Sequence, residues 1–362
     1  MEEKDKNHKA WAGEKKPSMK RRCEEQDYTE RGLYLITMAI EGRKPLLGEL
    51  AGKLERKDGP DRPHVVLSPF GEKVKTCWLS IQQYHPQIET MKLCIMPDHI
   101  HGILFVHEKI ECHLGHVING FKAGTRKAAR ELGIITAAIP QPTEQPQKQS
   151  PIPPSISPVS YAEAMPQPNK SSKHPSHGIL WEPGYNDRLL LKKNQLAHML
   201  AYLDDNPRRL LLKRQHPEYF TQLSPIPVFD TTMPAMGNRF LLERPLKLQV
   251  QCSRSLTSQE IEQRKQYFLE AGRKGAVIVS PCISPGEQQI ASACMAENIP
   301  LVVLLLKGFS PYFKPQPRYF EACAAGRLLM LAPYPFQNEK ITDMRQRCLH
   351  LNDLAAHICQ QK

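Results

Sequence analysis

A proline-rich segment divides this chain and limits how it can fold. Ten of the 32 prolines lie between Ile135 and His177, among Gln, Ser, Thr and Lys residues. Because proline lacks the backbone N–H and fixes its own φ angle, so many prolines cannot be placed inside a sheet or a helix. The composition is typical of an extended, semi-rigid linker. We therefore predict a disordered insertion over residues 135–177, with folded regions on both sides.

The beginning of the chain and its apolar runs bear on where the protein works. Residues 1–31 alternate Lys, Arg, Glu and Asp with almost no aliphatic residues, which predicts a disordered charged tail that is not a signal peptide. The longest strongly apolar run, residues 301–306, is far shorter than the roughly 20 residues of a membrane helix. The ten cysteines form no C-x-x-C pair, which argues against a zinc ribbon and a disulfide framework. We expect a cytoplasmic bacterial protein that acts at the nucleoid, without a membrane partner.

Strand and helix patterns alternate on both sides of the insertion. Strands are predicted at 33–40, 64–69, 181–191 and on both sides of the Pro97-Asp98 turn within 91–106, and helices at 71–84, 113–133 and 194–207. Helices and strands interleaved in this order favour an α+β fold, with helices on a small, mostly antiparallel sheet. We expect this domain to cover residues 32–220, interrupted by the insertion.

From residue 230 onward the pattern changes. Four short apolar runs at 246–252, 276–281, 301–306 and 328–333 are separated by helical stretches such as 258–272. Continuous apolar strands that alternate with helices indicate an α/β domain with a parallel sheet over residues 230–362. No G-x-G-x-x-G follows any of these strands, so no dinucleotide cofactor is expected. Ser284 and Gly286 lie where a loop can meet a phosphate before a helix; a docking or oligomerisation module is the alternative.

The pair His99 and His101 is the first candidate for chemistry. Alternation along a strand places both imidazoles on one face, about 7 Å apart along the backbone, which is close enough to hold one cation. The alternative is two half-buried strand histidines without a ligand.

The second candidate lies on the helix predicted to end at Pro207. Its apolar stripe runs through Leu196, Met199, Leu200 and Leu203, and Tyr202 lies roughly 110° from the centre of that stripe. Asn206 follows one turn later, so both side chains can point at a common target. Alternatively, Tyr202 is a packing residue and Asn206 only a helix stop.

Basic residues gather near both candidates. The chain carries a formal charge of +12, and the local clusters are candidates for contact with a polyanion. The candidate DNA-binding residues are Lys122, Arg126, Lys127, Arg130, Arg188, Lys192, Lys193, Arg208 and Arg209. A solvated charged face is the simpler interpretation.

Four segments together resemble the single-tyrosine HUH transposases, in particular the branch of the REP-associated tyrosine transposases. The segments are MPDHIHGILFV (96–106), FKAGTRKAARELG (121–133), WEPGYNDRLLL (181–191) and YLDDNPRRL (202–210), in the order in which the family has them. The C-terminal region faintly resembles the Rossmann-like domain of bacterial DNA-processing proteins that handle single-stranded DNA. The resemblance covers about 32–134 and 178–214.

The resemblance implies a ferredoxin-like domain that cleaves and rejoins single-stranded, hairpin-bearing DNA during transposition. His99 and His101 would be metal ligands, Asn206 the third ligand, and Tyr202 the nucleophile that forms a 5′-phosphotyrosine. Mixed nitrogen and oxygen ligation suits Mn²⁺ or Mg²⁺. Relatives often dimerise, so a homodimer is expected, in which Tyr202 works in cis or in trans.

Two other functions remain open from the sequence. A non-catalytic single-stranded DNA-binding protein derived from such an enzyme would use the C-terminal domain as its main working part. A metal phosphodiesterase would cleave DNA with water in place of Tyr202.

Overall fold

A computed structural model describes residues 26–56, 58–135, 180–228, 230–310, 313–337 and 339–360. The predicted insertion lies outside the described residues from position 136 to its end, as do residues 1–25 of the predicted tail. The chain divides into two compact units, Met1–Arg208 and Arg209–Lys362. The division falls within one helix, α4 (Gln195–Gln215), earlier in the chain than the predicted boundary between 220 and 230.

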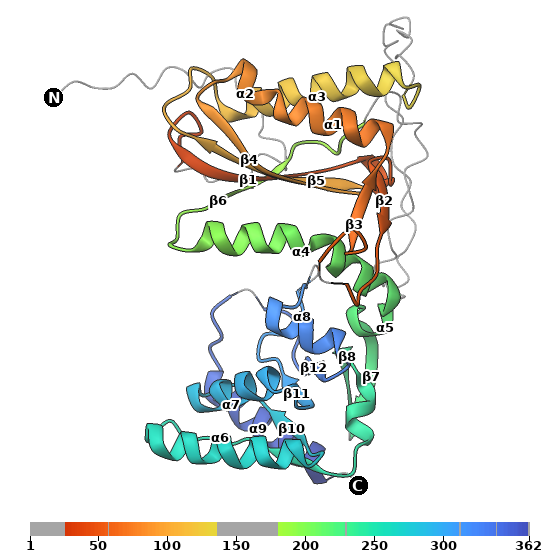
Figure 1. Cartoon of the computed structure of the whole chain (residues 1–362). Helices are drawn as coiled ribbons and strands as arrows, with labels where there is room; N and C mark the ends of the chain where they lie inside the picture. Colours follow the sequence, from red (N-terminus) through yellow and green to blue (C-terminus); the bar gives the residue numbers. More distant parts are fainter. Residues whose placement is uncertain are drawn as a thin grey trace, which may run out of the picture. The chain divides into compact units, whose positions relative to one another are not determined.

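The first unit is built on a four-stranded antiparallel sheet (Figure 1). Its strands, in spatial order, are β4 (Ile88–Met96), β5 (His99–Val106), β1 (Gly32–Ala39) and β6 (Asn186–Leu189). The predicted antiparallel sheet of an α+β domain is thereby confirmed. A separate two-stranded sheet, β2 (Gly48–Ala51) with β3 (His64–Leu67), adjoins it, and β2 was not predicted.

One face of the four-stranded sheet is apolar and lies under three helices. These are α1 (Pro69–Leu79), α2 (Ile81–Tyr84) and α3 (Leu114–Glu131), which lie on the same side of the sheet (Figure 1). Ile36, Ile100 and Trp78 are fully buried between the layers. A Cβ on Gly102 would come within 2.0 Å of the Trp78 ring, so the glycine makes room for the indole.

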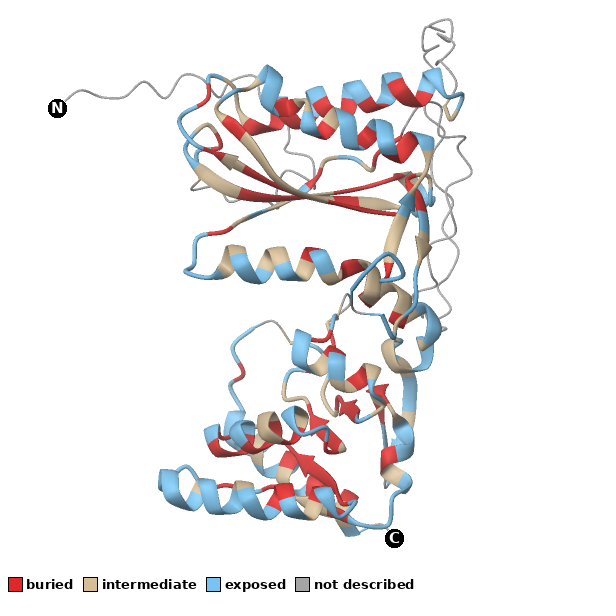
Figure 2. Cartoon of the chain, viewed as in Figure 1, coloured by how far each residue is buried: buried red, intermediate tan, exposed pale blue. Residues whose placement is uncertain are grey.

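Helix α4 covers the opposite face of the sheet. Within the first unit its buried residues are Leu203 and Asn206 (Figure 2). The prediction that this helix ends at Pro207 was wrong, because α4 continues through the proline to Gln215. Proline removes only one backbone hydrogen bond from a helix, and burial of Leu212 in the second unit helps to offset that loss.

Residues 26–31, at the end of the predicted charged tail, contact the first unit. Within residues 26–31, Tyr28 is 3% exposed, and its hydroxyl donates a 2.6 Å hydrogen bond to Asp187 Oδ2 in β6. The N–H groups of Ile110 and Leu114 also donate to the carbonyl oxygens of Thr29 and Tyr28, so backbone and side chain together join this part of the chain to the first unit.

The second unit contains a six-stranded mixed sheet. Its strands, in spatial order, are β7 (Leu223–Val228), β8 (Thr231–Gly237), β12 (Leu328–Leu331), β11 (Leu301–Leu304), β10 (Val277–Ser280) and β9 (Lys247–Gln249). Strands β9 to β12 are parallel, as predicted, whereas β7 and β8 add an antiparallel edge. This pair was not predicted, because prolines are rare in strands and three of them, Pro225, Pro227 and Pro234, lie within these two segments.

Both faces of this sheet are covered by apolar contacts. The remaining helices are α5 (Pro217–Phe220), α6 (Ser258–Arg273), α7 (Pro285–Ala296), α8 (Pro317–Ala324) and α9 (Met344–Gln360), with short 3₁₀ turns at Glu41–Arg43 and Arg239–Glu243. Phe268 of α6 and Ile290 of α7 are buried in one cluster, and Leu351 of α9 in the other. Over the described ranges, no helix is both long enough and apolar enough to span a membrane.

Candidate functional site

The two histidines of β5 lie side by side on the face of the sheet that α4 covers. Their ring centroids are 4.8 Å apart and the rings are nearly perpendicular, at 88°. The residue between them, Ile100, is fully buried on the other face. The alternation predicted from the sequence therefore places His99 and His101 together and outside the apolar core.

Each histidine ring is held by a hydrogen bond at its Nδ1 atom. Thr37 Oγ1 on the neighbouring strand β1 lies 2.8 Å from His101 Nδ1, and Asp98 Oδ1 lies 2.6 Å from His99 Nδ1. Metal-bound histidines nearly always engage their second ring nitrogen in this way, because the partner fixes the tautomer and the ring orientation. With Nδ1 engaged in both rings, Nε2 is the nitrogen that each ring would present to a cation.

Nearby charges determine the protonation state of Asp98, the carboxylate beside His99. Burial raises the pKa of Asp98, but the hydrogen bond and charge of His99, with the charge of Arg43, outweigh burial and hold the pKa below its ordinary value. An Arg43 Nη1 atom lies 3.6 Å from Asp98 Oδ2. Asp98 is therefore an anion that accepts a hydrogen bond from the Nδ1–H group of His99.

Asn206 of α4 lies near His101, as the strand register and a shared neighbour, Cys94, indicate. Cys94 of β4 is directly opposite His101 in the antiparallel pair, so both side chains are on one face of the sheet. Burial raises the pKa of the Cys94 thiol to about 11, and the neighbouring Asn206 amide partly opposes that rise. Asn206 is therefore next to Cys94, the residue that faces His101.

The Asn206 amide has the features of a ligand. The residue is 8% exposed, and its Nδ2 atom, which neighbours the Cys94 thiol, makes no hydrogen bond of ordinary geometry among the described residues. A half-turn of the amide would place Oδ1 there, and amide oxygen is a suitable ligand for Mg²⁺ or Mn²⁺. Within the described ranges, no group of three or more His, Cys, Asp and Glu side chains is positioned to hold a metal, so a cation here would need the asparagine.

Tyr202 lies one helical turn before Asn206, at the border of the buried side of α4. It is half-buried, and the next residue, Leu203, is 1% exposed. An ion pair between Lys92 of β4 and Asp204 also joins this part of α4 to the sheet. The structure therefore brings His99, His101 and Asn206 into one region, with Tyr202 beside them.

The basic residues of α3 do not belong to this region. Arg126, Lys127 and Arg130 are exposed on α3, and α3 covers the apolar face, opposite the face that carries the histidines (Figure 1). The sheet therefore lies between these three residues and the histidine pair, and DNA binding by Arg126, Lys127 and Arg130 stays a prediction.

Lys122 is bound to the backbone of its own unit. It is 6% exposed, and its Nζ atom donates to the carbonyl oxygens of Glu182 and Gly184. Burial lowers the pKa of Lys122 to about 8. Nearby, Trp181 Nε1 donates a 2.9 Å hydrogen bond to Thr125 Oγ1. In this conformation Lys122 positions the segment that leads to β6 and does not face solvent.

The remaining predicted basic residues have different surroundings. Arg188 is exposed on β6, where alternation places it on the face that α4 covers, and Lys192 and Lys193 are exposed just before α4. Arg208 is paired with Asp205, with Nε 2.5 Å from Oδ1. Arg209 belongs to the second unit, where its guanidinium carbon lies 3.6 Å from the Phe320 ring centroid.

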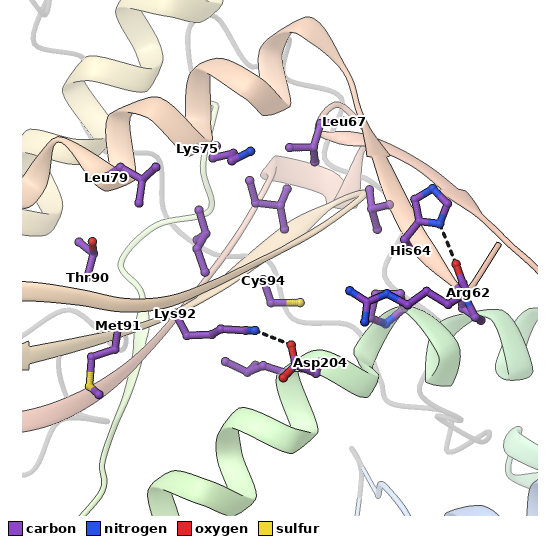
Figure 3. Close-up of a pocket in the computed structure, with 16 residues that line it drawn as sticks. Arg62, His64, Leu67, Lys75, Leu79, Thr90, Met91, Lys92, Cys94 and Asp204 are labelled. Atoms are coloured by element: carbon purple, nitrogen blue, oxygen red, sulfur yellow. Dashed lines mark hydrogen bonds and ion pairs between the residues drawn. The ribbon is translucent and has the colours of Figure 1, made fainter. Parts of the chain in front are cut away.

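A cavity of about 590 Å³ adjoins the candidate site on the open edge of β4 (Figure 3). Strands β3 and β4 and helices α1 and α4 contribute residues to it. They are Arg62, Pro63, His64, Val65, Leu67, Lys75, Leu79, Thr90, Met91, Lys92, Leu93, Cys94, Ile95, Leu203, Asp204 and Pro207. Cys94 thus lines this cavity and also lies opposite His101.

In the second unit, a carboxylate of the chain occupies the loop that was considered for phosphate. Ser284 caps helix α7, and buried Glu287 accepts hydrogen bonds from the N–H groups of Cys252, Ile283 and Ser284. A second cavity of about 670 Å³ lies beside this loop, and Arg254, Arg264 and Arg345 are among its lining residues. Glu287 therefore accepts hydrogen bonds from N–H groups to which an anion would otherwise bind.

Three residues of the candidate site, Thr37, Cys94 and Asp98, were not predicted from the sequence. Asp98 directly precedes the first histidine and was noticed only as a turn residue. Thr37 and Cys94 become visible only through the register of β1, β5 and β4.

Comparisons with known proteins give distant matches. No family model matches the chain. An uncharacterized protein of Haemophilus influenzae is 26% identical over 130 residues, which cover 30% of this chain and 67% of that protein.

Among solved structures, a REP-associated tyrosine transposase bound to a REP hairpin is 12% identical, with a TM-score of 0.29 over 51% of this chain and 72% of that chain. DNA processing protein A of Helicobacter pylori, studied for its single-stranded DNA binding, is 20% identical, with a TM-score of 0.31 over 39% of this chain and 66% of that chain. A structure from Deinococcus radiodurans, provisionally named a transposase, is 13% identical, with a TM-score of 0.26 over 51% of this chain and 97% of that chain.

Proposed function

We propose that this chain is a DNA transposase of the single-tyrosine kind, which cleaves and rejoins single-stranded, hairpin-bearing DNA. In this proposal the first unit is a ferredoxin-like catalytic domain and the second a Rossmann-like domain. One observation carries the proposal: two histidines, each held at Nδ1, lie beside a buried amide whose Nδ2 makes no hydrogen bond of ordinary geometry among the described residues, with Tyr202 one turn away.

His99, His101 and Asn206 would hold one Mg²⁺ or Mn²⁺ ion. When bound, such an ion neutralises the negative charge that develops on a phosphodiester under attack. Asp98 accepts from the Nδ1–H group of His99 and so fixes the tautomer of that ring, and Thr37 Oγ1 holds the orientation of the His101 ring. Arg188, Lys192 and Lys193 remain available for phosphate contacts near this face.

Tyr202 would be the nucleophile. Its hydroxyl oxygen attacks phosphorus and loses its proton, the P–O3′ bond breaks, and the 3′ oxygen takes up a proton. The 5′ phosphate stays on Tyr202 as a phosphotyrosine, so the energy of the broken bond is retained and the reverse step joins a new 3′-OH without ATP. A homodimer, with Tyr202 acting in cis or in trans, is part of this proposal.

The test is formation of a covalent adduct between the full chain and single-stranded hairpin DNA taken from the sequences that flank its gene. With Mn²⁺, we expect an adduct that is stable in denaturing gels for the wild type and for Tyr84→Phe, whose side chain is 79% exposed. Tyr202→Phe should form none.

Each other outcome has a distinct meaning. An equal yield of adduct from Tyr202→Phe would contradict the assignment of the nucleophile. Cleavage without an adduct in both proteins would indicate a phosphodiesterase that uses water. Binding that is tight, sensitive to salt and indifferent to chelator, without cleavage, would indicate a non-catalytic single-stranded DNA-binding protein.

A further inference from the structure

The cavity beside β4 follows the edge of a strand. Its lining includes six consecutive residues, from Thr90 to Ile95. Because alternate side chains of a strand point to opposite faces, six consecutive residues can border one cavity only if the backbone edge forms its wall. β4 pairs with β5 alone in its sheet, so alternate backbone N–H and C=O groups point away from β5, along this wall.

The charges around the cavity favour an anionic ligand. Arg62, His64 and Lys75 line it. No described carboxylate pairs with Arg62, whereas Lys75 Nζ lies 3.7 Å from Glu72 Oε2, which is outside the lining. Asp204 is the acidic residue of the lining, and Lys92 neutralises it (Figure 3). The cavity therefore has a net positive charge.

The other lining residues are apolar and partly exposed. Leu79 is 50% exposed on the rim, and Met91 lies at the irregular position where β4 shifts its register against β5. Apolar walls, hydrogen-bonding backbone groups and cations together suit a nucleotide, which has a flat base, a polar base edge and a phosphate. A volume of this size, inside the range of about 300–1,000 Å³ for small-molecule sites, admits a short unpaired stretch and excludes a duplex.

We infer that this cavity binds an unpaired deoxynucleotide of the substrate strand, next to the phosphodiester that is cleaved. The base would hydrogen-bond to the edge of β4, and Arg62 and Lys75 would contact phosphates. The inference rests on the proposed function, since Cys94 joins the cavity to the region of His101 and Asn206. Failure of this inference can be distinguished from failure of the proposed function.

The first experiment measures binding of a fluorescent oligothymidylate to the full chain in EDTA, by anisotropy. Leu79→Trp fills the rim of the cavity, and Val66→Trp is its control, because Val66 is 55% exposed and does not line the cavity. We expect a loss of about tenfold in affinity for Leu79→Trp and less than about twofold for Val66→Trp.

A second pair of variants tests the cations. Lys75→Ala should reduce the salt dependence of binding by about 0.7 in log–log slope, the value for one phosphate contact on single strands. Lys73→Ala, on the same helix and exposed but outside the cavity, should leave the slope unchanged. Equal effects in the two members of either pair would overturn the inference.

The third measurement locates the base. In the wild type, an oligonucleotide with one 5-iododeoxyuridine should cross-link to the peptide that contains Met91. In Leu79→Trp this cross-link should be absent. A cross-link elsewhere, or binding of an uncharged extended peptide that competes with DNA, would overturn the inference in favour of a strand-addition site.

If Leu79→Trp forms the Tyr202 adduct at wild-type affinity and rate, the nucleotide site is wrong and the proposed function stands. If the nucleotide binds here and no adduct forms with Mn²⁺, the proposed chemistry is wrong.

Discussion

Thr37 and His101 are opposite each other on β1 and β5, and a hydrogen bond of 2.8 Å joins Thr37 Oγ1 to His101 Nδ1. The residue that orients one imidazole therefore comes from a different strand, 64 positions earlier in the chain. Orientation of the ring depends on correct pairing of the sheet, so the proposed metal site is formed only when β1 and β5 are in register.

Thr37→Val removes this hydrogen bond while nearly preserving the size of the side chain. We expect Mn²⁺ affinity to fall by about 10- to 100-fold, because loss of a partner of this kind frees the ring and changes its tautomer. Titration followed by electron paramagnetic resonance measures free Mn²⁺ directly. Thr76→Val, on the exposed side of α1, is the control and should bind as the wild type. Unchanged affinity in Thr37→Val would mean that His101 is not a ligand.

Gly102→Ala should strongly destabilise the first unit, because the new methyl group would lie 2.0 Å from Trp78. Overpacking of a core typically costs about 1–3 kcal/mol, and here the obstacle is a fully buried indole, so we expect at least the upper end. Gly124→Ala on α3 is the control; its methyl group would meet Cys77 Sγ at 3.5 Å, an ordinary contact, and could gain up to about 1 kcal/mol. Urea denaturation followed by tryptophan fluorescence reports on this unit, in which Trp78 and Trp181 are buried. Equal stability of the two variants would contradict the packing described for Trp78.

Lys122 should make stability depend on pH in the alkaline range. Burial lowers its pKa from 10.5 to about 8 in the folded protein. Between these values the unfolded chain binds a proton that the folded chain does not, so the free energy of unfolding rises with pH through this group. Relative to Lys122→Met, the wild type should gain at most about 2 kcal/mol between pH 7.5 and 9.5. Urea denaturation at both pH values measures the difference, and exposed Lys127→Met is the control. Parallel pH profiles of the wild type and Lys122→Met would show that Lys122 titrates normally.

Glu287→Gln should destabilise the second unit. The carboxylate accepts hydrogen bonds from three backbone N–H groups, and a neutral amide replaces them poorly, which we expect to cost about 2–3 kcal/mol. Glu260 has the same capping-box geometry at the exposed start of α6, so Glu260→Gln should cost clearly less. Hydrogen exchange of the Cys252, Ile283 and Ser284 amides would locate the effect. Protection that is unchanged at these amides would contradict the role of Glu287.

Local patterns predicted much of the fold. Alternation gave β4 and β5 and the common face of the two histidines, and continuous apolar runs gave β9 to β12. Pro207 was a misleading stop signal, because burial further along a helix can outweigh one lost hydrogen bond.

The composition of the candidate site was harder to predict than its location. Thr37 depends on which strands pair, and the side on which a helix packs decides whether its charges reach a given face. Arg126 and Lys127 follow the histidines closely in sequence, yet α3 carries them on the opposite side of the sheet.

The alternation along β5 has a consequence for how such a gene can change over time. Ile100 and Gly102 face the apolar core, whereas His99 and His101 lie on the other face of the sheet and are not part of that core. A descendant that lost either histidine would keep its shape, so chemical inactivation and structural decay are separate events in this architecture. If the chain acts as proposed, a copy retained by its host for DNA binding alone would arise by substitution at these positions, with no intermediate that fails to fold.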